Sequence, residues 1–255
     1  MLEGKTGLVF GVANRRSIAW GIGQSLANAG ARLAFTYQDR VGDAVNELVA
    51  TLPNNPFTLA CDVLDDAQVD ETFEKVDQEL GGLDILVHSI AFAPRAALEN
   101  PFVETSRQDF RTALEISAYS LIQLTRKAAP LMEKRGGGSV ITMTFIGSDR
   151  VFPKYNVMGI AKATLESSVR YLASDLGTKN IRVNAISAGP VRTLAARSIQ
   201  GFPRMEEHVR EIAPLRRNTE PGEVGDVALF LASHLSRNVT GETIFCDAGY
   251  HAMGM

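Results

Sequence analysis

The stretch that decides the fold of this chain is Gly7-Leu8-Val9-Phe10-Gly11-Val12-Ala13-Asn14-Arg15-Arg16-Ser17-Ile18-Ala19-Trp20-Gly21-Ile22. A short apolar run, a glycine turn and a helical pattern follow one another, which is how a buried strand leads into a helix. Glycine permits the sharp turn, and small residues let the backbone approach a diphosphate at the helix N-terminus. The candidate contacts are Gly11, Ala13, Ser17 and Ile18. The spacing is not G-x-G-x-x-G, and one glycine turn can also simply connect two elements.

Apolar runs that end in loops alternate with amphipathic stretches along the rest of the chain. The apolar runs are residues 8–10, 31–37, 57–61, 85–88, 139–143, 182–186 and 243–246. Apolar residues recur at helical spacing in residues 17–29, 42–52, 66–80, 106–135, 155–176 and 221–233. Strands that alternate with helices pair in parallel. We therefore expect one α/β domain over residues 1–255, Rossmann-like and doubly wound, with seven mostly parallel strands flanked by helices.

Length and composition agree with one soluble globular domain and argue against several functional classes. The chain has 255 residues, 45% of them hydrophobic, and a net charge of −3 with no run of like charges. No apolar stretch reaches the roughly 18 residues that cross a bilayer. Four scattered histidines and two cysteines, Cys61 and Cys246, lack metal-ligand spacing. We expect no metal, nucleic acid or membrane partner, and a cytoplasmic location because no secretory leader precedes the first strand.

Residues 194–214 interrupt the alternation. They predict an irregular or short helical insertion, with apolar residues that we expect to be exposed: Leu194, Ile199, Phe202 and Met205. Insertions near strand ends often form substrate lids. The alternative is a surface helical pair whose apolar residues complete the core. The position after a candidate cofactor segment favours a lid, whose expected pocket residues are Ala195, Ala196, Ile199 and Phe202.

Tyr155 and Lys162 are the strongest candidates for catalysis. They are seven residues apart, and seven steps of about 100° return to within roughly 20° of the start, so both would share one helix face. A cation beside a phenol favours the phenolate and would lower a pKa that is ordinarily about 10. Tyr155 could then give up a proton or stabilise an oxyanion near neutral pH. The alternative is a half-buried ring and a solvated amine.

Two further residues bear on the cofactor. Asp62 follows the third expected strand, where an adenine would lie, and its carboxylate can accept a hydrogen bond from the exocyclic amine. A helix cap or loop role is the alternative. Gln38 follows the second strand, where the adenosine ribose would sit. A 2′-phosphate would require a basic residue there, so Gln38 favours NADH, although the nearby Arg40 leaves NADPH open.

Five segments carry a family pattern: residues 11–22, Cys61-Asp62-Val63, His88-Ser89-Ile90-Ala91-Phe92-Ala93, Tyr155 to Lys162, and Arg182 to Thr193. In this order they resemble the short-chain dehydrogenase/reductase superfamily and, within it, the bacterial enoyl-acyl-carrier-protein reductases of fatty-acid synthesis. The resemblance implies that NADH reduces the trans-2 double bond of an enoyl thioester, with Tyr155 as oxyanion donor and Lys162 on the nicotinamide ribose. The other cofactor contacts that it implies are Val63, Ser89, Ile90, Ala91, Ala188, Gly189, Pro190, Val191 and Thr193. It places in the substrate pocket Phe92, Ala93, Phe145, Tyr155 and Met158.

Several positions depart from related patterns. Carbonyl-reducing members carry Asn-Asn-Ala-Gly after the fourth strand, a serine about thirteen residues before the tyrosine, and a helix asparagine. At those places this chain has His88-Ser89-Ile90-Ala91, Thr142 and Ser117, which separates it from alcohol and ketone chemistry. Many bacterial enoyl reductases carry a second tyrosine ten residues before the first, whereas this chain has Phe145, as mycobacterial-type relatives do. We expect Phe145 to be an apolar wall, and Ala91, where glycine is common, to narrow the space near the nicotinamide.

The resemblance also implies an acyl-carrier protein as partner and a homotetramer. An acidic carrier would dock on Arg197, Arg204 or Arg210 around the lid, unless these are only solvated charges. The helices expected from Ser106 and Tyr155 would pack between subunits. Two alternatives for function stay open. One is another short-chain reductase acting on a ketone or alcohol, and the other is a non-catalytic dinucleotide-binding protein.

Overall fold

The structure is a computed structural model that describes residues 1–193, 196 and 201–254. Its centre is a seven-stranded sheet in the order β3-β2-β1-β4-β5-β6-β7. The strands are β1 (Thr6–Phe10), β2 (Arg32–Tyr37), β3 (Phe57–Ala60), β4 (Ile85–His88), β5 (Gly138–Thr144), β6 (Ile181–Ala188) and β7 (Thr243–Cys246). Each neighbouring pair is parallel. The predicted doubly wound α/β fold is confirmed, and this sheet is wholly rather than mostly parallel.

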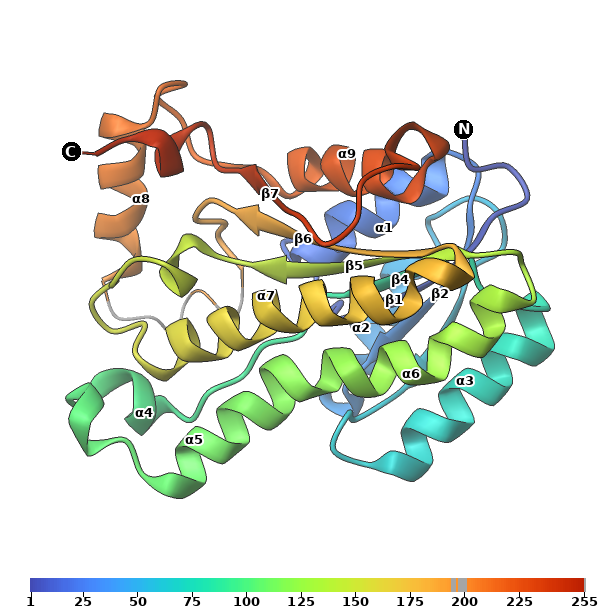
Figure 1. Ribbon diagram of the computed structural model, residues 1–255, viewed down its shortest axis with the longest axis horizontal. Coiled ribbons are helices and arrows are strands. Elements are labelled where there is room, and N and C mark those ends of the chain that lie inside the picture. The colour runs from blue at the N-terminus through green and yellow to red at the C-terminus, as the bar shows by residue number, and fades with distance from the viewer. Residues whose placement is uncertain (194–195, 197–200, 255) are drawn as a thin grey trace.

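Helices cover both faces of the sheet (Figure 1). One face carries α3 (Asp66–Leu80), α6 (Ser120–Glu133) and α7 (Val157–Leu176), and the other carries α1 (Ile18–Asn28), α2 (Gly42–Val49) and α9 (Pro221–Ala232). Successive side chains of a strand point to opposite faces. In β1, Leu8 and Phe10 accordingly lie in the core under α3, α6 and α7, and Val9 lies in the other core. Because both faces are buried at the centre of the sheet, β1 and β4 are fully buried, whereas the edge strands β3 and β7 are only partly buried.

Two glycines let α1 and α9 pack in close contact. A Cβ on Gly21 would lie 2.3 Å from the carbonyl oxygen of Pro221, and a Cβ on Gly225 would lie 2.5 Å from the carbonyl oxygen of Gly21. Real Cβ atoms essentially never approach so closely, so the packing requires glycine at both positions. This contact fixes α1, whose N-terminus follows the turn after β1.

Three helical regions differ from the prediction. The helix expected over residues 106–135 is α5 (Arg107–Leu114), a π-helical segment (Glu115–Tyr119) and α6 in direct succession. A single widened turn leaves the apolar spacing nearly helical, so the sequence pattern did not reveal it. The helix expected from residue 155 begins at Val157, and the short helix α4 (Arg95–Glu99) was not predicted. No helix of the described residues is both long and apolar enough to cross a membrane.

The expected lid is partly helical. Helix α8 (Phe202–Ile212) forms within it, and residues 194, 195 and 197–200 lie outside the described residues. Phe202 was expected to be exposed, but only 9% of it is accessible, because α8 is amphipathic and turns Phe202 inward together with Val209. Met205 is partly exposed.

Candidate active site

The candidate residues follow the carboxyl ends of the strands, and all of these ends meet at one edge because the strands are parallel. Gly11 follows β1, Ser89 follows β4, Phe145 follows β5 and Gly189 follows β6. From β1 the sheet runs through β2 to β3 on one side and through β4 to β7 on the other. Open α/β sheets bind ligands at such a switch point. The structure thus brings the predicted cofactor and catalytic residues to one edge.

Gly11 lets the loops after β1 and β4 meet. Its φ is 100°, and a Cβ there would lie 2.0 Å from the carbonyl oxygen of Ser89, so no other residue fits. The loop ends at Ser17, the N-cap of α1, whose hydroxyl accepts hydrogen bonds of 3.1 Å from the backbone N–H groups of Ala13 and Asn14. The first N–H groups of a helix have no intrahelical acceptor and favour an anion. The start of α1 therefore fits a diphosphate.

The remaining predicted cofactor residues line the same edge. Asp62 is exposed, and one of its carboxylate oxygens accepts a 3.0 Å hydrogen bond from the backbone of Leu64. A carboxylate has about four acceptor sites, so this bond leaves room for an adenine amine. The hydroxyl of Thr193 accepts a 3.0 Å hydrogen bond from the backbone of Ala196. Exposed or partly exposed positions are Gln38, Ser89, Ile90 and Ala91, and buried positions are Val63, Ala188, Gly189, Pro190 and Val191.

Tyr155 stands before α7 rather than on it. The backbone reverses at Asn156, where φ is 41° and ψ is −119°, and the helix begins at Val157. The prediction that Tyr155 and Lys162 share one helix face is therefore wrong, because the periodicity of a helix does not extend through this turn. The Tyr155 ring packs edge-on against Phe145 with their centroids 5.1 Å apart, and 7% of the residue is accessible.

Lys162 lies on α7 and is only 5% accessible. Its ammonium donates a 2.8 Å hydrogen bond to the carbonyl oxygen of Met143 on β5. Burial lowers the pKa of Lys162 to about 8, while the carboxylate of Glu166, one helical turn further on, acts in the opposite direction. The cation is therefore fixed against the sheet edge and is present below about pH 8.

The pKa of Tyr155 moves against the prediction. Burial raises it above its ordinary value, and the negative charge of Glu166 raises it further. Desolvation disfavours the phenolate, so the prediction of an easily ionised phenol is wrong. Near neutral pH Tyr155 keeps its hydroxyl proton. It can donate that proton in a hydrogen bond to a developing oxyanion, which is the donor role rather than the base role.

The imidazole of His88 is bound on both sides inside the core. Its Nδ1 and Nε2 atoms lie 2.8 Å from the hydroxyls of Thr142 and Ser120. The same two hydroxyls also donate to backbone carbonyl oxygens, Ser120 to Ile116 at 2.6 Å and Thr142 to His88 at 3.2 Å, so both are fully engaged in the core. Thr142 occupies the serine position of carbonyl reductases but is engaged with His88. Burial, with a smaller effect of the Lys162 cation, lowers the pKa of His88 to about 3.

We expect this histidine to make the fold acid-sensitive. Between about pH 6.5 and 3, His88 is protonated in the unfolded chain but neutral in the folded chain. The free energy of unfolding therefore falls as the pH falls. One such proton contributes at most about 1.4 kcal/mol per pH unit. Unfolding in urea at pH 7, 6 and 5 should show a flatter dependence for His88→Gln than for the parent. His234→Gln, at an exposed histidine, is the control, and an equal slope for His88→Gln and the parent contradicts the prediction.

The predicted substrate residues gather around Tyr155. One apolar cluster joins Tyr155 and Met158 with the partly buried Ala93 and Phe145. The segment that contains Ala93 is held by Ser117 on the π-helical segment, because this hydroxyl accepts from the N–H of Phe92 at 2.9 Å and donates to its carbonyl at 3.0 Å. The Phe92 side chain is 48% accessible. From the lid, Ala196 and Phe202 are buried, whereas Ala195, Ile199 and Arg197 lie outside the described residues.

Gly147 supports the Tyr155 ring. A Cβ at this position would lie 2.7 and 2.8 Å from two ring carbons of Tyr155 and 2.9 Å from the Phe145 ring. We expect Gly147→Ala to displace the phenol and to lower kcat about tenfold while NADH affinity is kept. Steady-state rates and NADH fluorescence titration measure the two quantities. Gly177→Ala is the control because a Cβ there meets no atom within 4 Å, and an unchanged kcat for Gly147→Ala would contradict the prediction.

Sequence reasoning missed three residues around Tyr155. Gly147, Lys154 and Asn156 contact the tyrosine or the segments beside it, and none was singled out. Asparagine tolerates positive φ, so Asn156 after a predicted catalytic residue was the one available signal for the turn.

The chain is similar to known proteins over nearly its whole length. The family model described as enoyl-(acyl carrier protein) reductase matches residues 11–251. The enoyl-acyl-carrier-protein reductase (NADH) FabI of Nostoc sp. is 52% identical over 100% of this chain and 99% of that protein. The FabI of Bacillus cereus is 51% identical, again over 100% and 99%.

Two solved structures are closely similar. The Bacillus cereus reductase with NADP+ and indole naphthyridinone has a TM-score of 0.97 and 51% identity, covering 100% of this chain and 99% of that one. The Anaplasma phagocytophilum reductase in complex with NAD has a TM-score of 0.95 and 46% identity, covering 100% and 96%. A family match over nearly the whole sequence, with half of the residues identical in full-length relatives, shows that this chain belongs to the enoyl-(acyl carrier protein) reductase family.

Proposed function

We propose that this protein reduces the trans-2 double bond of enoyl-acyl-carrier-protein thioesters with NADH, the last step of the fatty-acid elongation cycle. The observation that carries the proposal is the buried Tyr155 ring at the sheet edge that also holds the cofactor loops. Bound NADH supplies a hydride to the β-carbon of the substrate. Tyr155 donates a hydrogen bond to the thioester oxygen, where negative charge then develops. The α-carbon receives its proton from Tyr155 or from a water linked to it.

The other predicted site residues bind the cofactor. Lys162 holds the nicotinamide ribose, the turn at Gly11 and the start of α1 hold the diphosphate, and Asp62 binds the adenine. Neutral Gln38 beside the adenosine ribose favours NADH, which is also the cofactor named for the FabI reductases of Nostoc sp. and Bacillus cereus. The Bacillus cereus structure with NADP+ makes NADPH the second cofactor to measure.

Substrate choice tests the reaction class. The loss of NADH absorbance is followed with crotonyl thioester and, separately, with acetoacetyl thioester. The proposal predicts turnover of the crotonyl thioester and none of the acetoacetyl thioester, because Thr142 and Ser117 are engaged elsewhere and no carbonyl-reducing relay is assembled. The reverse preference would show a ketone reductase. NADH binding without turnover of either thioester would show a non-catalytic protein.

The lid and the carrier site belong to the same proposal. Helix α8 would cover the acyl chain, and it is tied to the segment after β6 because the Arg192 side chain donates hydrogen bonds of 2.7 and 2.8 Å to the buried carboxylate of Glu206. Arg204 and Arg210 are exposed on α8 and would meet an acidic acyl-carrier protein. Arg204→Glu with Arg210→Glu should raise KM for the carrier-bound substrate but not for a free thioester.

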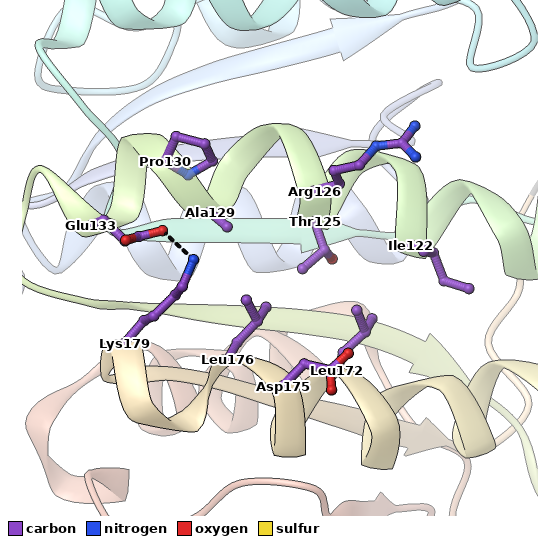
Figure 2. A pocket seen from close by; sticks show the side chains of 10 residues that line it. All are labelled: Ile122, Thr125, Arg126, Ala129, Pro130, Glu133, Leu172, Asp175, Leu176 and Lys179. Atoms are coloured by element: carbon purple, nitrogen blue, oxygen red, sulfur yellow. Dashed lines mark hydrogen bonds and ion pairs between the residues drawn. The ribbon is translucent and has the colours of Figure 1, made fainter.

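A homotetramer is supported by uncovered apolar side chains on the long helices. These are Phe110, Tyr119, Ile122, Ile160 and Tyr171. Between α6 and the C-terminal half of α7 lies a cleft of about 260 Å³, with Ile122 and Leu172 on its walls and the Lys179–Glu133 ion pair across one end (Figure 2). Light scattering should give four times the 27.6 kDa of one chain, and Tyr171→Asp should lower that mass.

One domain over residues 1–255 and a cytoplasmic location complete the proposal. A single sheet includes strands from Thr6 to Cys246, and the two cysteines, Cys61 and Cys246, are unpaired, which agrees with a reducing compartment.

A further inference from the structure

The backbone of Asn156 is strained at the point where the catalytic tyrosine leaves its turn. A φ of 41° with a ψ of −119° is close to the first central position of a type II′ turn, which glycine normally fills. The turn is closed by a 2.9 Å hydrogen bond from the N–H of Met158 to the carbonyl oxygen of Tyr155. Residues persist in such a conformation only where their surroundings fix them, and they gather at functional sites.

The side chain of Asn156 supplies that fixation. Its amide nitrogen lies 3.3, 3.1 and 2.9 Å from the carbonyl oxygens of Ala97, Leu98 and Asn100. These carbonyls belong to the end of α4, where a helix leaves its last acceptors without intrahelical donors. The two N–H groups of one amide are thus directed at three acceptors.

Lys154, on the other side of Tyr155, repeats this arrangement. Its φ is 66°, and its ammonium donates a 2.6 Å hydrogen bond to the carbonyl oxygen of Glu99. Both chain neighbours of Tyr155 therefore have a positive φ, and both bind the end of α4. Because two residues with strained backbones both bind the carbonyl groups at the end of α4, we infer that this contact has a function.

The segment that they hold is the one that lines the predicted substrate pocket. It begins at Phe92, whose backbone is bound by Ser117, and it ends at Asn100. Between these two anchors, Ala97 and Leu98 pack in the same apolar cluster as the Tyr155 ring. Movement of the segment and movement of the phenol are therefore mechanically linked.

We propose that Asn156 and Lys154 are positioning residues, which lock residues 92–100 onto Tyr155 and so set the direction of its hydroxyl toward the enoyl thioester. This inference rests on the proposed function. Neither side chain reaches the loops assigned to the diphosphate, so their loss affects the chemical step and the acyl substrate but not NADH.

Asn156→Asp is the sharpest single change. Aspartate has the same shape and the same tolerance of positive φ, but it replaces the donor with a carboxylate facing three carbonyl oxygens. We expect kcat with crotonyl thioester to fall about 10- to 100-fold, while the Kd of NADH is unchanged. Asn55→Asp is the matched control, because Asn55 also has a positive φ, 50°, but lies exposed in a loop far from the site. Equal kcat values for Asn156→Asp and the control overturn the proposal.

Substitutions at Lys154 test the same proposal with little change in side-chain size. Lys154→Met retains the apolar stem but cannot donate to Glu99, and Lys154→Arg retains a donor. The proposal predicts a lower kcat for the methionine variant and recovery for the arginine variant, and equal losses in both overturn it.

A double-mutant cycle shows whether Asn156 acts through the phenol. In a Tyr155→Phe background, Asn156→Asp should lower kcat little further, because no hydroxyl remains for Asn156 to orient. If the fold-losses in kcat of the two single variants multiply in the double variant, the positioning role is overturned but the proposed function is not. Full activity of Tyr155→Phe alone contradicts the proposed function of the tyrosine, and the positioning role fails with it.

Discussion

Tyr155→Phe is expected to lower kcat with an enoyl thioester about 100- to 1000-fold, or about 3 kcal/mol in activation free energy. The change removes one oxygen and leaves the ring in its contacts with Phe145 and Gly147. The phenol is buried and protonated, so its contribution is a directed hydrogen bond to the oxyanion and not a base. NADH affinity should stay unchanged, because Tyr155 is not assigned to the cofactor loops. Steady-state kinetics and fluorescence titration separate the two effects.

The matched control for this prediction is Tyr171→Phe. Tyr171 lies on α7, the helix that follows Tyr155, and is 74% accessible in one chain. Phenylalanine keeps the ring that the proposed subunit contact uses and removes only the hydroxyl, so kcat should be unchanged. A Tyr155→Phe variant that turns over at the rate of this control removes the tyrosine from the mechanism.

Lys162→Ala is expected to damage both binding and turnover. A hydrogen bond from a charged donor contributes about 1.5–3 kcal/mol, so the Kd of NADH should rise about 10- to 100-fold. The kcat should also fall, because the nicotinamide is no longer held beside Tyr155. Lys179→Ala, at an exposed lysine beyond the end of the same helix, should change neither quantity. A normal Kd with a low kcat would contradict the assignment of Lys162 to the ribose.

The pH dependence of NADH binding provides an independent test of Lys162. Its pKa is lowered to about 8, so the ammonium is present below that pH and is lost above it. The parent protein should bind NADH more weakly as the pH rises through about 8, whereas Lys162→Ala should show no such change. Parallel titration curves for the two proteins would contradict the prediction.

The sheet was predictable because its central strands are buried on both faces and are therefore mainly apolar in the sequence. The turn at Gly11 was also predictable, because a glycine between an apolar run and a helical pattern indicates a turn. The geometry of Tyr155 was not predictable in this way. Helical spacing from Tyr155 to Lys162 continues in the sequence, but the backbone reverses at Asn156, and periodicity contains no information on φ.

The direction of the pKa shift of Tyr155 could not be predicted from the sequence for a different reason. The sequence contained a lysine seven residues away, which argued for a lower pKa, whereas the desolvation that raises the pKa comes from residues brought together only by the fold. Phe145 is an example, because it follows β5 ten residues before Tyr155 and only the folding of the intervening segment brings its ring onto the phenol. The π-helical segment at Glu115–Tyr119 and helix α4 were missed because one widened turn and one five-residue helix leave no distinct pattern.

The most direct test of the central claim is a crystal structure with NAD bound together with an unreactive enoyl-thioester analogue. We expect the Tyr155 hydroxyl to lie about 2.7 Å from the thioester oxygen, as an O–H donor should, with the β-carbon beside the reactive carbon of the nicotinamide. A complex in which other groups bind that oxygen and the phenol points away from it would contradict the assignment of Tyr155 as the oxyanion donor.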